Sequence, residues 1–144
     1  MPLYADTSFL ASIYLPDANS AKAQAIVRGL TAPLPFTALH RLELHNAIEL
    51  SVFRGRVTAA QVPQLHRALA TDLRMGRLQP EHATWYPVFR VAANLARTHT
   101  AATGTRSLDV LHVALAWKLG AVEFFSFDLR QKTLAIAAGL TVRP

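Results

Sequence analysis

The sequence predicts an α/β protein with a mainly parallel sheet that helices cover on both faces. Short apolar runs alternate along the chain with longer segments of three- and four-residue periodicity, and turn residues separate them at regular intervals. Strands that alternate with helices pair in parallel through right-handed crossovers. The chain has 144 residues, the size of one ordinary domain, so we expect a single domain over residues 1–144.

The first 80 residues contain three of the predicted strands. Polar residues at the helix starts can act as N-caps, as Thr37 and Thr58 illustrate, and glycine fits the left-handed residue that closes a helix, as at Gly55. The predicted strands are 3–5, 34–36 and 78–79. The predicted helices are one that Asp6-Thr7-Ser8 can cap and that runs until Pro16, one from about 19 to 29, one that Thr37 can cap and that ends at Gly55, and one from 58 to about 74.

The second half predicts two helices of different character, followed by a strand, a helix and a strand. The segment 81–98 is amphipathic, and Trp85, Tyr86 and Phe89 form a stripe that we expect to pack in the core, with an RNA-stacking or dimer surface as the alternative. Ser107 can cap a helix over 108–119 that is apolar on almost every side and should lie deep in the domain. The remaining predicted elements are a strand at 122–127, a helix at 129–138 and a strand at 140–142.

Composition limits the partners and the location of the protein. Fifteen basic residues, twelve of them arginine, face nine acidic ones, and the net charge of +6 favours a polyanion or an acidic protein as partner. Zero cysteines exclude disulfides and thiolate metal sites. No segment has the length of a membrane span or the layout of a signal peptide, so we expect a cytoplasmic protein with no membrane partner.

Four of the nine carboxylates stand where a solvated surface charge is not expected. Asp6 and Asp128 each follow an apolar strand, at the sheet edge where ligands bind in open α/β folds. Each also precedes a helix, so an N-cap role is the alternative. Glu43 and Asp109 lie on apolar helix faces, where a buried acid needs a cation, hydrogen bonds or a metal. The alternatives are an arginine salt bridge for Glu43 and a helix-dipole role for Asp109.

These four acids predict a metal site if they converge at one sheet edge. Carboxylate oxygens suit Mg²⁺ or Mn²⁺, which are hard ions. Such an ion can activate a water molecule and neutralise charge that develops on a phosphate, so the site needs no nucleophilic side chain. Arg106 and Arg130 adjoin two of the acids and are expected either to contact phosphates and neutralise the acids or to be plain solvated residues.

Four segments in order along the chain resemble the signature segments of the PIN domain, and the VapC-type toxins in particular. The segments are Leu3-Tyr4-Ala5-Asp6-Thr7-Ser8, Leu42-Glu43-Leu44, Ser107-Leu108-Asp109-Val110-Leu111-His112-Val113-Ala114 and Phe125-Ser126-Phe127-Asp128. Together, the four segments cover the chain from residue 3 to about residue 128, with the order and spacing of the family's segments.

The resemblance implies a three-layer α/β/α sandwich and Mg²⁺- or Mn²⁺-dependent endoribonuclease activity. It also implies a homodimer and inhibition by a small VapB-like antitoxin with a DNA-binding end. By matching positions, Asp6, Glu43, Asp109 and Asp128 correspond to the family's acidic centre, and Ser8 and Ser126 to positions that orient those acids. The Phe127 position is often polar in relatives.

Other sites and functions fit the sequence less well. His40 and His45 lack the spacing of paired metal ligands on a helix, and His112 is expected to be a hydrogen-bonded core histidine or a residue that supports the acids. No P-loop, dinucleotide-binding or α/β-hydrolase motif occurs. A catalytically silent PIN-like RNA-binding module and a receiver-like phospho-acceptor domain remain as alternatives, although the four intact acids favour the enzyme, and Lys132 is poorly placed for a receiver.

Overall fold

Parallel strands, as the sequence predicts, make up both sheets of the protein in residues 2–144, which the computed structural model describes. The strands are β1 (Leu3–Ala5), β2 (Leu34–Phe36), β3 (Leu78–Pro80), β4 (Glu123–Phe125) and β5 (Thr141–Arg143). One sheet has the strand order β1-β4-β5, and the other pairs β2 with β3. The mixed α/β class is therefore confirmed.

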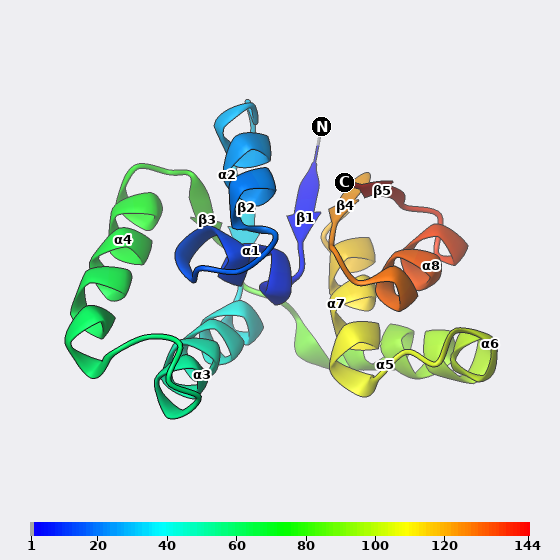
Figure 1. The fold of residues 1–144 in the computed structure, drawn as a ribbon. Helices are drawn as coiled ribbons and strands as arrows, with labels where there is room; N and C mark the ends of the chain where they lie inside the picture. Colours follow the sequence, from blue (N-terminus) through cyan, green and yellow to red (C-terminus); the bar gives the residue numbers. More distant parts are fainter. Residues whose placement is uncertain (1) are drawn as a thin grey trace. The chain divides into compact units, whose positions relative to one another are not determined.

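Helices make up most of the rest of the chain (Figure 1). They are α1 (Thr7–Tyr14), α2 (Ser20–Arg28), α3 (Ala38–Phe53), α4 (Val62–Arg74), α5 (Trp85–Leu95), α6 (Ala101–Thr103), α7 (Ser107–Lys118) and α8 (Leu129–Ala137). The chain divides into two units: the first combines residues 2–6 with His82–Pro144, and the second is Thr7–Glu81.

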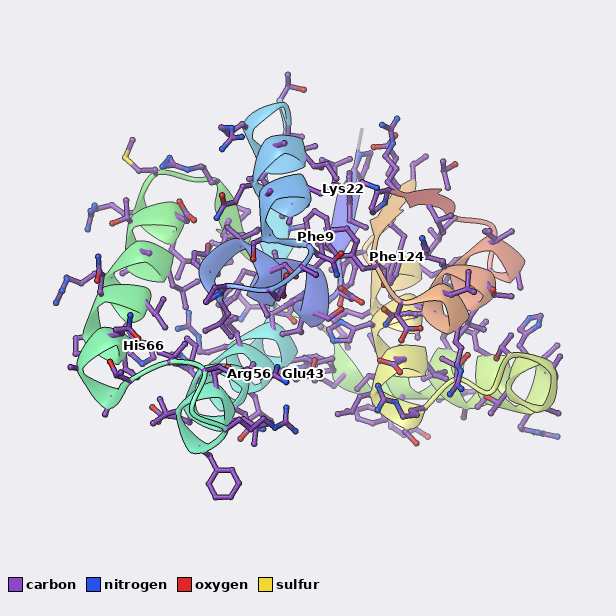
Figure 2. The ribbon with its side chains drawn as sticks, viewed as in Figure 1. Phe9, Lys22, Glu43, Arg56, His66 and Phe124 are labelled. Atoms are coloured by element: carbon purple, nitrogen blue, oxygen red, sulfur yellow. The ribbon has the colours of Figure 1, made fainter. Side chains whose placement is uncertain are left out.

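The first unit is built around β1, β4 and β5 and the apolar helix α7. Ala5 pairs with Phe125, which pairs with Arg143, so the carboxyl ends of the three strands lie side by side. Phe124, labelled in Figure 2, is fully buried and stacks on Tyr4 at 5.6 Å between ring centroids. Helix α7 packs against α5 and α8, and its residues Val110–Ala116 are all buried, as its composition predicts.

The second unit packs α1 against α2 and α3. Thr37 accepts from the backbone N–H of His40, and the His40 side chain returns to the backbone of Thr37, so the two residues cap α3 reciprocally. Phe9 on α1 is fully buried (Figure 2). The capped helix α3 carries Glu43 in its second turn.

The helix expected over 81–98 begins four residues later, at Trp85. Pro87 explains the later start, because a proline in a helix interior lacks an N–H and clashes with the carbonyl four residues before it, whereas the first turn tolerates proline. The sequence also predicts that the helix ends at about residue 98. Instead, a π-helical stretch, Ala96–Thr100, follows α5 and leads into α6.

Two further expectations are wrong in detail. Tyr86 and Phe89 are 76% and 55% exposed and do not pack in the core, because α5 buries the face that carries Val88 and Ala92. Ser107 does not cap α7: it is the first helical residue, and Arg106 occupies the N-cap position with an extended backbone and no side-chain cap bond.

Within the described residues, none of the helices combines the length and the apolar character that crossing a membrane requires.

Candidate active site

The carboxyl ends of β1 and β4 bring Asp6 and Ser126 together in the first unit. Asp6 continues the strand pairing, because its N–H donates to the carbonyl of Phe125 at 3.0 Å. Ser126 is anchored in the same way to the carbonyl of Arg143 on β5, at 2.9 Å. Both side chains are buried, and Ser126 Oγ lies 2.8 Å from Asp6 Oδ2. The predicted role of Ser126, orientation of an acid, stays a prediction.

Asp128 follows two residues later and caps α8. Its Oδ1 accepts from the backbone N–H of Gln131 at 2.8 Å, which confirms the N-cap alternative as a local role. Its own N–H donates to Ser126 Oγ at 3.0 Å. A cap uses one carboxylate oxygen, so the role does not exclude a second ligand on the other.

Asp109 lies in the first turn of α7, with its side chain 23% exposed. Arg106 Nε contacts Asp109 Oδ2 at 3.3 Å, a long ion pair to an arginine that is 81% exposed, so the pair contributes little stability. The carbonyl of Asp109 accepts from Gln131 Nε2 at 3.3 Å. Ser126 and Gln131 therefore connect the positions of Asp6, Asp109 and Asp128 within one unit.

Asp109 and Asp128 face the same pocket. This pocket of about 320 Å³ is lined by Gly104, Arg106, Asp109, Asp128, Leu129 and Arg130. Gly104 has a φ of 65°, the left-handed conformation that lets the chain leave α6 and turn into α7. The two predicted arginines thus line the same pocket as two of the acids, where they can receive a phosphate.

Glu43, the fourth predicted acid, belongs to the second unit and lies on α3 (Figure 2). Its Oε1 accepts from Thr7 Oγ1 at 2.9 Å, and Thr7 is buried. Thr7 is a partner that the sequence did not suggest. The membership of Glu43 in one centre with the three aspartates stays a prediction.

Ser8 and His112 are the other two residues expected to support the acids, and that role stays a prediction for both. Ser8 is exposed on α1, and its carbonyl accepts from Ser12 Oγ at 3.1 Å. His112 is buried on α7, where its Nδ1 lies 2.6 Å from the hydroxyl of Tyr4. The expectation of a hydrogen-bonded core histidine agrees with this contact.

The pocket is lined by carboxylate oxygens, the type of ligand atom that a hard divalent cation prefers. In the described part of the chain, no three histidine or acidic side chains are gathered closely enough to enclose an ion. Mg²⁺ does not require such a cage, because it keeps several waters and is commonly held by one or two carboxylates together with substrate phosphates. Asp109 and Asp128, which share the pocket, can supply those two carboxylates.

Comparisons with known proteins identify the fold. No family model and no curated protein sequence matches the chain. Among solved structures, the toxin VapC20 of Mycobacterium tuberculosis, described as cleaving the sarcin–ricin loop, has a TM-score of 0.69 at 20% identity and covers 99% of each chain. FitAcB from Neisseria gonorrhoeae has a TM-score of 0.69 at 19% identity, covering 99% of this chain and 96% of that one.

VapBC2 from Rickettsia felis, solved bound to a DNA fragment from its promoter, has a TM-score of 0.64 at 14% identity, covering 99% of this chain and 98% of that one. At such identities the likeness establishes the fold. The chain has the fold of the VapC-type toxins, so the predicted resemblance is confirmed at the level of fold.

Proposed function

We propose that this chain is a Mg²⁺- or Mn²⁺-dependent endoribonuclease and the toxin of a toxin–antitoxin pair. The observation that carries the proposal is the connected set of three aspartates in the first unit, two of which share a pocket with two arginines. The fold that the chain shares with VapC20, a toxin that cleaves the sarcin–ricin loop, supports the same proposal.

Each residue has a distinct part in the proposed reaction. Asp109 and Asp128 would hold the cation, and Asp6, fixed by Ser126, would hold or orient it from the end of β1. Glu43 is assigned to the same centre on its sequence match. The cation, when bound, would lower the pKa of a water and offset charge on the phosphate. Arg106 and Arg130 would bind the phosphates that flank the cut.

The partners follow from charge and from the neighbours. A net charge of +6 favours RNA as substrate. FitAB was solved bound to a DNA fragment, as was VapBC2, so we propose a small VapB-like antitoxin with a DNA-binding end. The exposed Tyr86 and Phe89 on α5 offer apolar surface for a homodimer.

RNA cleavage by the purified chain tests the proposal. We expect cuts in a panel of labelled RNA hairpins, including a sarcin–ricin loop, with Mg²⁺ or Mn²⁺ and none with EDTA. The D109N variant, purified in parallel, controls for contaminating nuclease. Cleavage that persists in EDTA and is absent from the D109N preparation would refute the metal-dependent mechanism.

A further inference from the structure

Gln131 is a fully buried amide in the first turn of α8. A buried amide costs free energy unless its oxygen and nitrogen find partners, so its contacts determine why it is tolerated. It lies in the same unit as Asp6, Asp109 and Asp128. None of the sequence motifs described above includes this residue.

The contacts of Gln131 reach the surroundings of all three aspartates. Its backbone N–H donates to Asp128 Oδ1 at 2.8 Å, and its Nε2 donates to the carbonyl of Asp109 at 3.3 Å. Its Oε1 lies 2.9 Å from Ser126 Oγ, the hydroxyl that also contacts Asp6. These partners satisfy the buried amide and also connect it to groups beside the three aspartates.

The side-chain amide has one orientation that suits these contacts. The carbonyl of Asp109 can only accept, so Nε2 must face it, and Oε1 then faces Ser126. Ser126 has a single hydroxyl proton and two acceptors at almost equal distance, Asp6 Oδ2 at 2.8 Å and Gln131 Oε1 at 2.9 Å. The hydroxyl therefore lies between the amide oxygen and Asp6, and Gln131 helps to fix its position.

We propose that Gln131 is a positioning residue of the proposed nuclease, acting on Asp6 through Ser126 and on Asp109 through its backbone carbonyl. The inference rests on the proposed function and deepens it. Groups that orient the ligands of a metal typically change metal affinity or activity by about 10–100-fold when they are removed. Gln131 would thus orient the acids in addition to Ser126, the serine that the sequence predicts for that role.

The test compares Q131M, S126A and the double variant. Methionine keeps the length and volume of the glutamine while removing both polar atoms of the amide. We expect each single variant to weaken Mn²⁺ binding, measured by titration calorimetry without RNA, or to lower kcat at saturating Mn²⁺, by about 10–100-fold. Because Gln131 acts partly through Ser126, the double variant should lose less than the product of the two single effects.

A matched control separates positioning from stability. Leu134, buried one turn further along α8, carries no polar side-chain atom, so L134V lowers stability by packing alone. Melting curves would establish that all variants are folded at the assay temperature. We expect L134V to keep the wild-type Mn²⁺ affinity and kcat.

The outcomes distinguish this inference from the proposed function. Folded Q131M with wild-type Mn²⁺ affinity and kcat would overturn the role of Gln131 while the proposed function stands. Fully multiplicative effects in the double variant would overturn its action through Ser126. If wild type binds Mn²⁺ but cuts no RNA, the proposed function fails and the Mn²⁺ affinities alone judge Gln131. A wild type that neither binds Mn²⁺ nor cuts RNA overturns both.

Discussion

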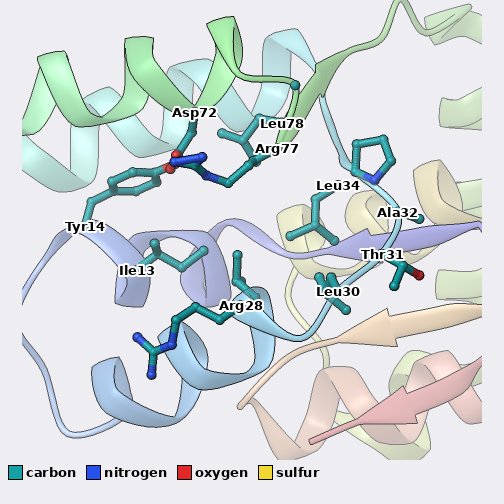
Figure 3. A pocket seen from close by; sticks show the side chains of 13 residues that line it. Ile13, Tyr14, Arg28, Leu30, Thr31, Ala32, Leu34, Asp72, Arg77 and Leu78 are labelled. Carbon is teal, nitrogen blue, oxygen red and sulfur yellow. The ribbon is translucent and has the colours of Figure 1, made fainter.

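Asp72 in the second unit and Asp109 in the first have nearly the same exposure, 20% and 23%, but different partners. Both oxygens of Asp72 receive strong donors: the Tyr14 hydroxyl donates to Oδ2 at 2.6 Å and Arg77 Nε to Oδ1 at 2.9 Å (Figure 3). Among the described residues, the carboxylate of Asp109 has one long contact, to the exposed Arg106. Burial alone therefore does not distinguish a structural acid from a candidate metal ligand; the donors around it do.

The pockets beside these acids differ in the same way. Asp72, Tyr14 and Arg77 form part of the lining of a pocket of about 440 Å³ in the second unit, where the carboxylate is already neutralised (Figure 3). The smaller pocket of the first unit is lined by two aspartates, which could bind a cation, and by two arginines, which could bind a phosphate. A cation should therefore prefer the smaller pocket, because the carboxylate of Asp72 in the larger pocket is already paired with Arg77.

The largest effect that tests this comparison is on RNA cleavage. We expect D6N, D109N and D128N each to lower kcat by more than about 100-fold, since a bound cation contributes several kcal/mol and each change removes a charge that would hold it. D72N should cut at the wild-type rate and be less stable, because Arg77 loses its partner. Single-turnover cleavage and melting curves of all four variants measure both effects.

Glu43 belongs to the second unit, and the E43Q variant tests its assignment to the proposed centre. If E43Q lowers kcat as much as the three aspartate variants do, Glu43 acts in their centre. If E43Q cuts at the wild-type rate and is less stable, as expected of D72N, the bond of Glu43 to Thr7 is structural. Two of the three aspartate variants retaining wild-type cleavage would show that the assigned centre is wrong.

The second effect concerns stability in the presence of metal. At a hundred times its dissociation constant, Mn²⁺ should stabilise the wild type by about 2.7 kcal/mol and D109N far less. In EDTA, D109N should be as stable as the wild type or more stable, because the substitution removes one charge from a group of acids. Thermal melts in EDTA and in Mn²⁺ measure the difference. A D109N variant that melts clearly lower in EDTA, with no gain from Mn²⁺ in the wild type, would make Asp109 structural like Asp72.

The third effect is confined to the second unit. Y14F removes the hydrogen bond to Asp72, and bonds to charged groups contribute about 1.5–3 kcal/mol, so the free energy of unfolding should fall by that order. Burial first, and then the bond to Asp72, raise the pKa of Tyr14 above its ordinary value of 10.0. The folded protein thus holds this proton more tightly than the unfolded chain, so the contribution is present below pH 10 and is lost as the pH rises above it.

Denaturant titrations of the wild type and Y14F at pH 8 and pH 10.5 measure this effect. Y14F should be less stable at pH 8, and the difference should narrow at the higher pH. RNA cleavage at pH 8 should not change. A Y14F variant as stable as the wild type would show that the hydrogen bond contributes nothing net.

Much of the fold and the positions of three acids follow from local sequence signals. Asp6 and Asp128 stand out because each follows an apolar strand, and Asp109 because it begins an apolar helix. Gln131 could not be found in this way, because a glutamine in a helix resembles a surface residue until Ser126 and Asp109 are known to be its neighbours. The pairing of Tyr14 with Asp72 spans 58 positions and leaves no periodic trace.

The wrong predictions for Ser107, Tyr86 and Phe89 have local structural causes. Ser107 is a favoured capping residue, but the turn after Gly104 places Arg106 at the cap position instead. Tyr86 and Phe89 look like core residues, but the face of α5 that packs on α7 is the one bearing Val88 and Ala92. Aromatic spacing identifies a helical stripe without showing which side of the helix faces its neighbour.

The smallest effect is the pH dependence that His45 gives to the second unit. His45 on α3 and His66 on α4 lie 4.9 Å apart between ring centroids. Burial, then the neighbouring His66 and then Arg41 lower the pKa of His45 below its ordinary value of 6.5. The unfolded chain therefore takes up this proton more readily than the folded protein, so stability is lost as the pH falls below 6.5 and levels off below the folded pKa.

We expect H45Q to flatten the decline of Tm between pH 7 and pH 5, because glutamine does not titrate in that range. H66Q should flatten it partly, since it removes one of the charges that oppose protonation of His45. The difference from the wild type should stay below the 2–4 °C that about 1 kcal/mol produces in a domain of this size, because His45 is partly exposed. Melting curves at half-unit pH intervals, with RNA cleavage at pH 7 as the reference for function, measure it. An H45Q variant whose Tm declines as steeply as that of the wild type would assign the acid sensitivity to other groups.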